Sequence, residues 1–331
     1  MPPVAVDEMI VLGTGTSGEP RHDPVRCAYV SSAPQWPCSR TYPLVGSVPI
    51  VGCLTASPPT CPTCTSTAPE NTRLNTCAVF RIGDKNLLVD CGKTFYNTAL
   101  RWFPHHGLRR IDALLLTHAH ADAYFGLDDL RQWTLGAFVQ DCIDVYCTRA
   151  TFDEVSRTFP YLVDKGMATG GGDVAEFRWH TFDEARPFTV ESCGGVEVTP
   201  LPVEHGRFFK TGEPFWNMGF RLGPFSYIGD CSRIPDSTTA LVKGSQGLVI
   251  DGLRYGVHPS HFGIEQARQY VRDMFAPAER PRKTWMTGFS HAVEHFAAIK
   301  DCEEWAAGDG QGIWIRPAYD GMRVRIQDLD T

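Results

Sequence analysis

The sequence predicts a layered α/β fold in a single domain. Short apolar runs of strand length occur near both ends of the chain, and segments in which apolar residues recur at helical spacing lie between them. The 331 residues contain no sequence repeat, no long low-complexity tract and no charge run that would mark a linker. We therefore expect one domain over residues 1–331, with a Cys-rich insertion at about residues 21–70.

The expected elements follow in chain order. A first strand leads into a glycine-containing turn at residues 13–20, and a hairpin turns about Gly83 and Asp84. We expect strands at residues 9–12, 77–82, 86–90, 111–116, 143–147, 196–203, 219–222, 225–228, 247–250, 312–316 and 322–326. We expect helices at residues 95–102, 152–159, 264–275 and 293–307, and apolar residues also recur at helical spacing from 127 to 135.

Composition limits the class of protein. A hydrophobic content of 43% with 21% charged residues is ordinary for a globular chain, and a net charge of −7 gives no general attraction to nucleic acid or anionic membranes. The N-terminus lacks a basic segment followed by a long apolar one, and no apolar run approaches the roughly 20 residues of a membrane span. We therefore expect a cytoplasmic protein whose twelve cysteines are reduced, some of them bound to metal.

The segment THAHADAYFGLDDLR, residues 117–131, is the main functional signal. It follows the buried strand expected at 111–116, so its polar side chains lie in the turn between a strand and a helix. In an extended turn, residues i and i+2 project to the same side, so His118 and His120 can present ring nitrogens to one cation. Asp122 continues the row and can take a second metal or a metal-bound water.

Further acids and histidines sit where other strands end or helices begin. Glu204 and His205 close one expected strand, Asp230 closes another, and His258 and His261 lie in a loop that opens a helix. Each residue alone is weak evidence, because such residues are more often surface or core residues. Together with THAHAD they form a recognisable order of metal-binding residue types.

This order resembles the metallo-β-lactamase superfamily, in which an HxHxDH loop is followed by a strand-end His, a strand-end Asp and a late His. LGTG, VPIVGC, LLVDCG, THAHAD, HPSH and TGFSH make the chain most similar to the phosphodiesterase branch, typified by the cyclic-phosphate phosphodiesterase of bacterial phosphonate breakdown. The resemblance implies an αββα sandwich with metal at one edge of the two sheets.

The resemblance also implies roles for individual residues. His118, His120 and His205 would hold the first metal, Asp230 would bridge to a second, and Asp90 would lie beneath them and fix ring orientation. Asp122 would orient or deprotonate the attacking water. His261 matches the branch's general acid, which would protonate the leaving group.

Two departures from the family pattern fall on the second metal site. Ala123 stands where the family has a histidine directly after the loop aspartate, and Gly288 stands where it has the late metal-binding histidine. We expect this site to be rebuilt, or the centre reduced to one tightly held metal. Cys231 could supply a soft ligand, but strand alternation places it on the face opposite to Asp230.

The cysteines form a second signal. Cys61 and Cys64 make a CxxC, and Cys53 lies eight residues earlier, which leaves a tetrahedral zinc site one ligand short. The phosphodiesterase branch supplies that ligand from a late histidine, which corresponds to His291. His295 is the alternative ligand. A Cys₃His site of this kind would tie the long early loop to the active-site region.

The sequence thus predicts a metal-dependent hydrolase, a phosphodiesterase that acts on a small or cyclic phosphodiester. We expect structural Zn²⁺, with Zn²⁺ or Mn²⁺ at the active site. The alternatives are a mononuclear thioester or ester hydrolase and a non-catalytic zinc-binding scaffold. We expect no membrane partner and no nucleic-acid substrate, since no Gly- and Lys-rich arm is present. Related phosphodiesterases are often dimers, so the resemblance also implies a homodimer.

Overall fold

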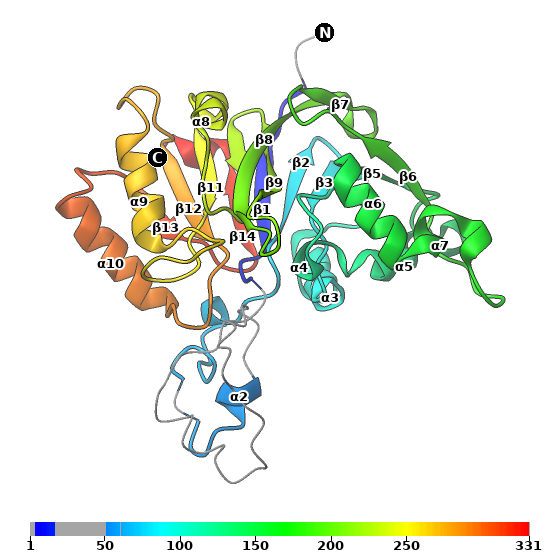
Figure 1. Cartoon of the computed structure of the whole chain (residues 1–331), viewed down its shortest axis with the longest axis horizontal. Helices are drawn as coiled ribbons and strands as arrows, with labels where there is room; N and C mark the ends of the chain where they lie inside the picture. Colours follow the sequence, from blue (N-terminus) through cyan, green and yellow to red (C-terminus); the bar gives the residue numbers. More distant parts are fainter. Residues whose placement is uncertain (1–3, 17–50, 60, 331) are drawn as a thin grey trace.

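Two seven-stranded β-sheets lie face to face, with helices on both outer surfaces (Figure 1). The structure, a computed structural model, describes residues 4–16, 51–59 and 61–330. It confirms the predicted αββα sandwich in one layered domain. Most of the predicted Cys-rich insertion at 21–70 lies outside the described residues.

The first sheet combines antiparallel strands at one side with parallel strands at the other. Its order is β14 (Met322–Arg325), β1 (Glu8–Gly13), β2 (Cys77–Ile82), β3 (Lys85–Val89), β4 (Ala113–Leu115), β5 (Ile143–Cys147) and β6 (Phe177–Thr181). Five helices lie with this half of the molecule: α3 (Phe95–His106), α4 (Ala121–Tyr124), α5 (Arg131–Thr134), α6 (Arg149–Thr158) and α7 (Pro160–Val163).

The second sheet has the same number of strands. Its order is β13 (Ile315–Pro317), β12 (Lys283–Thr287), β11 (Gly247–Asp251), β10 (Phe225–Tyr227), β9 (Pro214–Leu222), β8 (Val196–Arg207) and β7 (Phe188–Val190). Its outer face is covered by α8 (Asp236–Val242), α9 (Ile264–Asp273) and α10 (His295–Ala307). The short helix α2 (Val51–Leu54) lies apart, below the sandwich in Figure 1.

Successive side chains of a strand point to opposite faces of its sheet, and here both faces are covered by apolar cores. In β1, Met9 and Val11 point into the core between the sheets, whereas Ile10 and Leu12 pack against the helices. Because both faces are covered, such strands read as continuous apolar runs rather than alternating ones. This is why these strands could be predicted from short apolar segments.

Most predicted elements are present, and the differences have local causes. The helical pattern at 127–135 is broken into 3₁₀ and α pieces, Leu127–Leu130 and Arg131–Thr134, and Gly136 then adopts a left-handed conformation that ends the helical path. The elements that were not predicted are strands β6, β7 and β12 and helices α2, α4, α7 and α8. The strand expected at 312–316 begins only at Ile315.

The ends of the central strands position the functional residues. Strands β10, β11 and β12 run parallel, so their carboxyl ends meet at one edge, where Asp230, Asp251 and Gly288 lie. Strands β3 and β4 of the first sheet are also parallel and lead to Asp90 and His118. Within the described ranges, no helix combines the length and the apolar character needed to span a membrane.

The inter-sheet core provides a stability test. Phe80 is fully buried between the sheets, where its ring contacts Phe225 and Tyr227. Phe80→Ala should lower the free energy of unfolding by about 3–5 kcal/mol, because it removes apolar contacts and leaves a cavity. Chemical denaturation measures this. Phe138 is largely exposed, so Phe138→Ala should change stability by less than about 0.5 kcal/mol, and equal losses would contradict the core assignment.

Candidate metal centre

The THAHAD segment forms the turn between β4 and α4. His118 lies in the loop after β4, and His120 is the residue that precedes the first turn of α4, with extended backbone dihedrals. The turn therefore brings both imidazoles to the edge of the sheets. Their ring centroids are 4.5 Å apart.

His205 joins these two histidines from the second sheet. It lies near the end of β8, where the pairing with β9 is irregular between Glu204 and Arg207. One ring nitrogen from each of His118, His120 and His205 lies within 4.8 Å of the other two. The structure thus brings together the three histidines that the sequence predicted as ligands of the first metal.

Hydrogen bonds determine which ring nitrogens can bind a cation. Thr117 Oγ1 donates to Asp90 Oδ2 at 2.7 Å, so it can only accept from His118 Nδ1, 2.8 Å away. His205 Nδ1 donates to the carbonyl of Ser260 at 2.6 Å. Each of these histidines therefore keeps an unprotonated Nε2 for a ligand. Asp90 occupies the supporting position that the resemblance implied.

Gly206 allows the Ser260 loop to approach His205. Its φ is +77°, and a Cβ built there would lie 2.8 Å from Cβ of Ser260. Any larger residue would both strain the backbone and push the loop away.

The unpaired atoms of the cluster fit a metal ion. Among the described residues, Nε2 of His118 and Oδ1 of Asp230 are buried without a hydrogen-bond partner. Nε2 of His205 and Nδ1 of His120 lie 3.1 Å apart, and Asp230 Oδ2 lies 3.8 Å from His118 Nε2. Buried polar atoms are rarely left unpaired. A divalent cation would give Nε2 of His118 and Oδ1 of Asp230 a partner, so the donor set fits the group that the fold family implies.

Burial sets the protonation states in this cluster. It lowers the pKa of His118 and His205 well below the ordinary value and also lowers that of His120, which favours the neutral imidazoles that a metal requires. Burial also raises the pKa of Asp230 to about 8. A bound cation would offset this cost and favour the carboxylate.

The region where the family pattern has its second metal contains a small cavity. Asp122, Ala123 and Asp230 are among the residues that line a cavity of about 10 Å³, roughly the space for one water molecule. Thr16 Oγ1 donates to Asp122 Oδ2 at 3.4 Å. The alanine therefore leaves a gap in place of the family's histidine ligand.

The second departure from the family pattern, Gly288, is explained by the neighbouring side chain of Asp251. Gly288 has a φ of +73°, and a Cβ built there would lie 2.7 Å from Oδ1 of Asp251. The buried carboxylate of Asp251 therefore occupies the space that a side chain at position 288 would need. Glycine is therefore the residue that fits beside the end of the neighbouring strand, β11.

Asp251 in turn holds His261. Nδ1 of His261 lies 2.8 Å from Asp251 Oδ2, and the His261 ring centroid is 4.7 Å from that of His205. Burial acts to lower the pKa of His261, but the charges of Asp251, Asp230 and Asp122 together raise it to about 9. Ligand atoms of His205, Asp230 and His261 also lie within 4.8 Å of one another. His261 can thus donate a proton beside the cluster.

The sequence interpretation missed Asp251. Asp251 could have been recognised from the sequence, because it is the last residue of the apolar strand GLVID, and Asp90 and Asp230 also follow apolar strands. Cys231 donates its backbone N–H to Asp251, but its side chain belongs to the apolar cluster under the helices. This agrees with the expectation that it faces away from Asp230.

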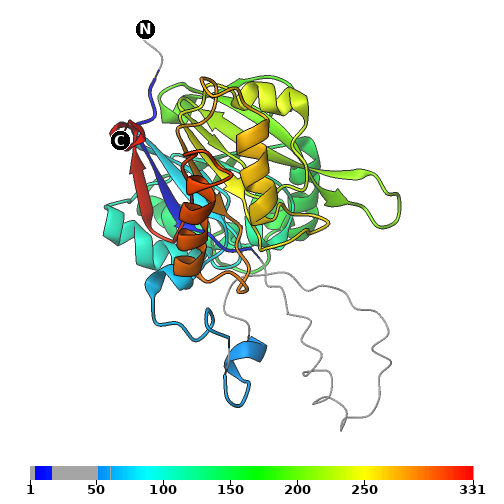
Figure 2. The same ribbon diagram turned by 90° about the vertical axis from the view of Figure 1, so that its left-hand side faces the viewer.

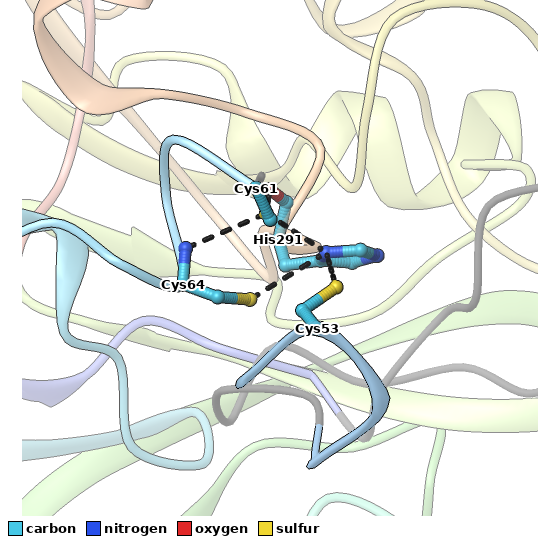
Figure 3. A group of neighbouring side chains, drawn as sticks. All are labelled: Cys53, Cys61, Cys64 and His291. Carbon is cyan, nitrogen blue, oxygen red and sulfur yellow. Dashed lines mark hydrogen bonds between the residues drawn. The ribbon is translucent and has the colours of Figure 1, made fainter. Parts of the chain in front are cut away.

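A separate group of three cysteines and one histidine lies beside the sandwich (Figure 3). The Sγ atoms of Cys53, Cys61 and Cys64 lie 3.6, 3.4 and 3.6 Å from Nδ1 of His291. Zn–S bonds of about 2.3 Å and a Zn–N bond of about 2.0–2.1 Å, arranged tetrahedrally, give an S···N separation of about 3.6 Å. The four atoms therefore have the spacing of a structural zinc site.

The structure places His291, rather than His295, against the cysteines. His295 begins α10, and its backbone N–H donates to Asn71 Oδ1. Burial opposes ionisation of Cys61, but hydrogen bonds from Cys64 and Thr63 leave its pKa below the ordinary value, which favours the thiolate that zinc needs.

Four further histidines of the described residues lie outside the two clusters of candidate ligands. His105 and His106 pack against the Trp102 ring, and His180 Nε2 lies 3.0 Å from Asp144. His258 lies behind His261, with ring centroids 5.2 Å apart.

Metal content provides the first test of the two groups. Cys61→Ser should remove one zinc per chain and His118→Ala a different metal, because the two groups share no ligand. Mass spectrometry of the purified variants measures both. His295→Ala should retain the zinc if His291 is the ligand. A single metal per chain that persists in His118→Ala would overturn the assignment of the histidine cluster.

The support of His118 by Thr117 can be tested separately. Thr117→Val removes the hydroxyl that links Asp90 to His118 Nδ1. We expect the affinity for the metal at the histidine cluster to fall by about 10–100-fold, as for other residues that orient a ligand. Competition with a chelator measures this. Thr148→Val, in the cap of α6, should leave the affinity unchanged.

Comparison with known proteins gives the family. A family profile described as a beta-lactamase superfamily domain matches residues 85–282, more than half of the chain. An octanoyltransferase of Porphyromonas gingivalis is 30% identical over 224 residues, which cover 66% of this chain and 40% of that protein. A ribonuclease Z of Bradyrhizobium diazoefficiens is 29% identical over 141 residues, 42% of this chain and 43% of that protein. The chain thus spans about 40% of the length of these curated relatives.

Solved structures share the fold over nearly the whole chain. A diphosphatase from the PhnP family superposes with a TM-score of 0.67 at 23% identity, covering 96% of this chain and 97% of the other. Zn²⁺-bound PqqB from Methylobacterium extorquens gives a TM-score of 0.65 at 18% identity, covering 96% and 100%. These structures show the shared fold, and the profile match over residues 85–282 shows that the chain belongs to the metallo-β-lactamase superfamily.

Proposed function

We propose that the protein is a metal-dependent phosphodiesterase that hydrolyses a small or cyclic phosphodiester. The observation that carries this proposal is the convergence of His118, His120 and His205 on one point, with the Asp251–His261 pair beside it. A metal site next to a proton donor is the arrangement that ester hydrolysis requires.

The side chains divide the work between them. His118, His120 and His205 would hold the first cation and Asp230 would lie beside it, with Zn²⁺ or Mn²⁺ as candidates. A divalent cation bound there would act as a Lewis acid on a phosphoryl oxygen and lower the pKa of a coordinated water. Asp122 would orient the attacking water and accept its proton.

The leaving group needs a proton, and His261 would supply it. Asp251 accepts from Nδ1, which fixes the ring and leaves Nε2 as the donating atom. The carboxylate also favours the protonated imidazole at neutral pH. Cleavage of the P–O bond would transfer the Nε2 proton to the departing alkoxide.

The names of the relatives support both candidate chemistries, because the octanoyltransferase is named for acyl transfer and two others for phosphate chemistry. Two similar proteins are named a diphosphatase and a ribonuclease. The zinc group of Cys53, Cys61, Cys64 and His291 would serve stability rather than catalysis, since all four of its positions are filled by side chains. A cytoplasmic location, a homodimer and the lack of a nucleic-acid substrate stay predictions.

A mononuclear thioester or ester hydrolase is the second candidate. The small cavity beside Ala123 and the carboxylate of Asp251 beside Gly288 both favour a centre with one tightly held metal. One cation can suffice for attack on a carbonyl. A non-catalytic zinc scaffold is less well supported, because a scaffold has no use for unpaired histidine nitrogens at the sheet edge.

Turnover of paired substrates separates these functions. With added Zn²⁺ or Mn²⁺, bis(p-nitrophenyl) phosphate should be hydrolysed faster than a thioester such as S-phenyl thioacetate, and His118→Ala should abolish the activity. Absorbance of the released phenol or thiol measures both. Faster thioester hydrolysis would favour the second candidate, and no hydrolysis of either would favour the scaffold.

The role of His261 can be tested through the leaving group. His261→Gln should lower kcat by about 10²–10⁴-fold for an alkyl phosphodiester and far less for a nitrophenyl ester, because nitrophenolate departs without a proton. Asp251→Asn should give the same pattern with a smaller loss, and His180→Gln should match the wild type. Equal losses on both substrates, or loss of metal from His261→Gln, would instead make His261 a ligand.

A further inference from the structure

The hairpin between β8 and β9 projects from the body of the molecule, shown in yellow-green in Figure 2. Its tip is held by hydrogen bonds: the backbone N–H of Phe208 donates to the carbonyl of Glu213 at 2.9 Å, and that of Gly212 donates to Phe208 at 2.8 Å. The guanidinium of Arg207 also donates to the carbonyl of Gly212 at 3.0 Å. The hairpin can therefore present side chains in a fixed arrangement.

Aromatic rings run from this hairpin to the histidine cluster. The ring of Phe215 stacks on the imidazole of His120, with centroids 4.7 Å apart and planes 11° from parallel. The ring of Phe208 packs edge-on against Phe215 at 5.5 Å and is 50% exposed. One end of this aromatic surface thus touches a proposed metal ligand, and the other faces solvent.

The position of Phe215 has a structural explanation, but that of the exposed Phe208 does not. Phe215 is partly buried and holds the His120 ring in place. Phe208 adds an exposed apolar face one ring further out, where it supports no ligand directly. An exposed ring that continues from a reactive centre is suited to contact a substrate.

We propose that Phe208 and Phe215 form an aromatic subsite that packs against an aromatic ester group of the substrate. This inference rests on the proposed phosphodiesterase function. With phosphorus held beside His120, an ester group a few bonds away would lie along the two rings. A planar aromatic group gains ring–ring contact there as well as burial, whereas a saturated group gains burial only.

Two matched substrates test the subsite. Methyl benzyl phosphate and methyl cyclohexylmethyl phosphate have similar size, charge and alkoxide leaving groups, and differ in whether the ring is aromatic. Phosphorus NMR follows their hydrolysis by the metal-loaded protein. The wild type should prefer the benzyl ester in kcat/KM by roughly tenfold, the size of one good aromatic contact. Binding of the two monoesters, measured by calorimetry, should show the same preference.

Variants of neighbouring phenylalanines locate the effect. Phe208→Leu keeps an apolar side chain but removes the ring, so it should bring the two kcat/KM values close together with metal content unchanged. Phe209 is fully exposed at the tip and makes no ring contact with the described residues, so Phe209→Leu should keep the wild-type preference.

The outcomes distinguish this inference from the proposed function. If the wild type hydrolyses both esters without preference, or if Phe208→Leu lowers both rates equally, the aromatic subsite is wrong while phosphodiester hydrolysis stands. If the preference disappears in Phe209→Leu instead, the contact lies elsewhere on the hairpin and the subsite is also wrong. If the wild type hydrolyses neither ester and binds neither monoester, the proposed function itself fails.

Discussion

The burial of two imidazoles, His118 and His205, against His120 and the carboxylate of Asp230 is the constraint on which this molecule depends. Ring nitrogens that face one another with two of the three rings buried are unfavourable unless a cation lies between them. Each ring has a neighbour that fixes it. Thr117 and Asp90 orient His118, the Ser260 carbonyl orients His205, and the ring of Phe215 stacks on His120. The parallel strands place these groups because their carboxyl ends meet at one edge.

The two departures from the family pattern have different physical meanings. Ala123 stands where the family pattern has a histidine, and it lines a space of about 10 Å³. At Gly288 the space is filled by Asp251, whose carboxylate supports His261 rather than a metal. At this edge of the second sheet, Gly288 offers no ligand, while Asp251 orients His261. This arrangement suits a hydrolase that depends on one cation and one acid.

Much of the fold could be predicted because the buried strands are short apolar runs separated by polar turns. The THAHAD turn was predictable because its residues are adjacent in sequence. Asp251 was recognisable as an acid at the end of an apolar strand, but its pairing with His261, ten positions away, depends on a loop that folds back. Strand β12 was missed because KTWMT carries polar residues that only the buried context makes compatible with a central strand. The contact between Phe208 and Phe215 could not be predicted, because it depends on the register of β8 and β9, which the sequence pattern does not give.

The Cys₃His group has a consequence for how the chain is made. Its cysteines precede His291 by 227 to 238 positions. During synthesis the three thiols leave the ribosome long before their fourth partner does, so the tetrahedral set is complete only when nearly all strands of both sheets exist. Zinc held by the early cysteines would then be captured by a late loop, and the closing of this site would mark the end of folding rather than its beginning.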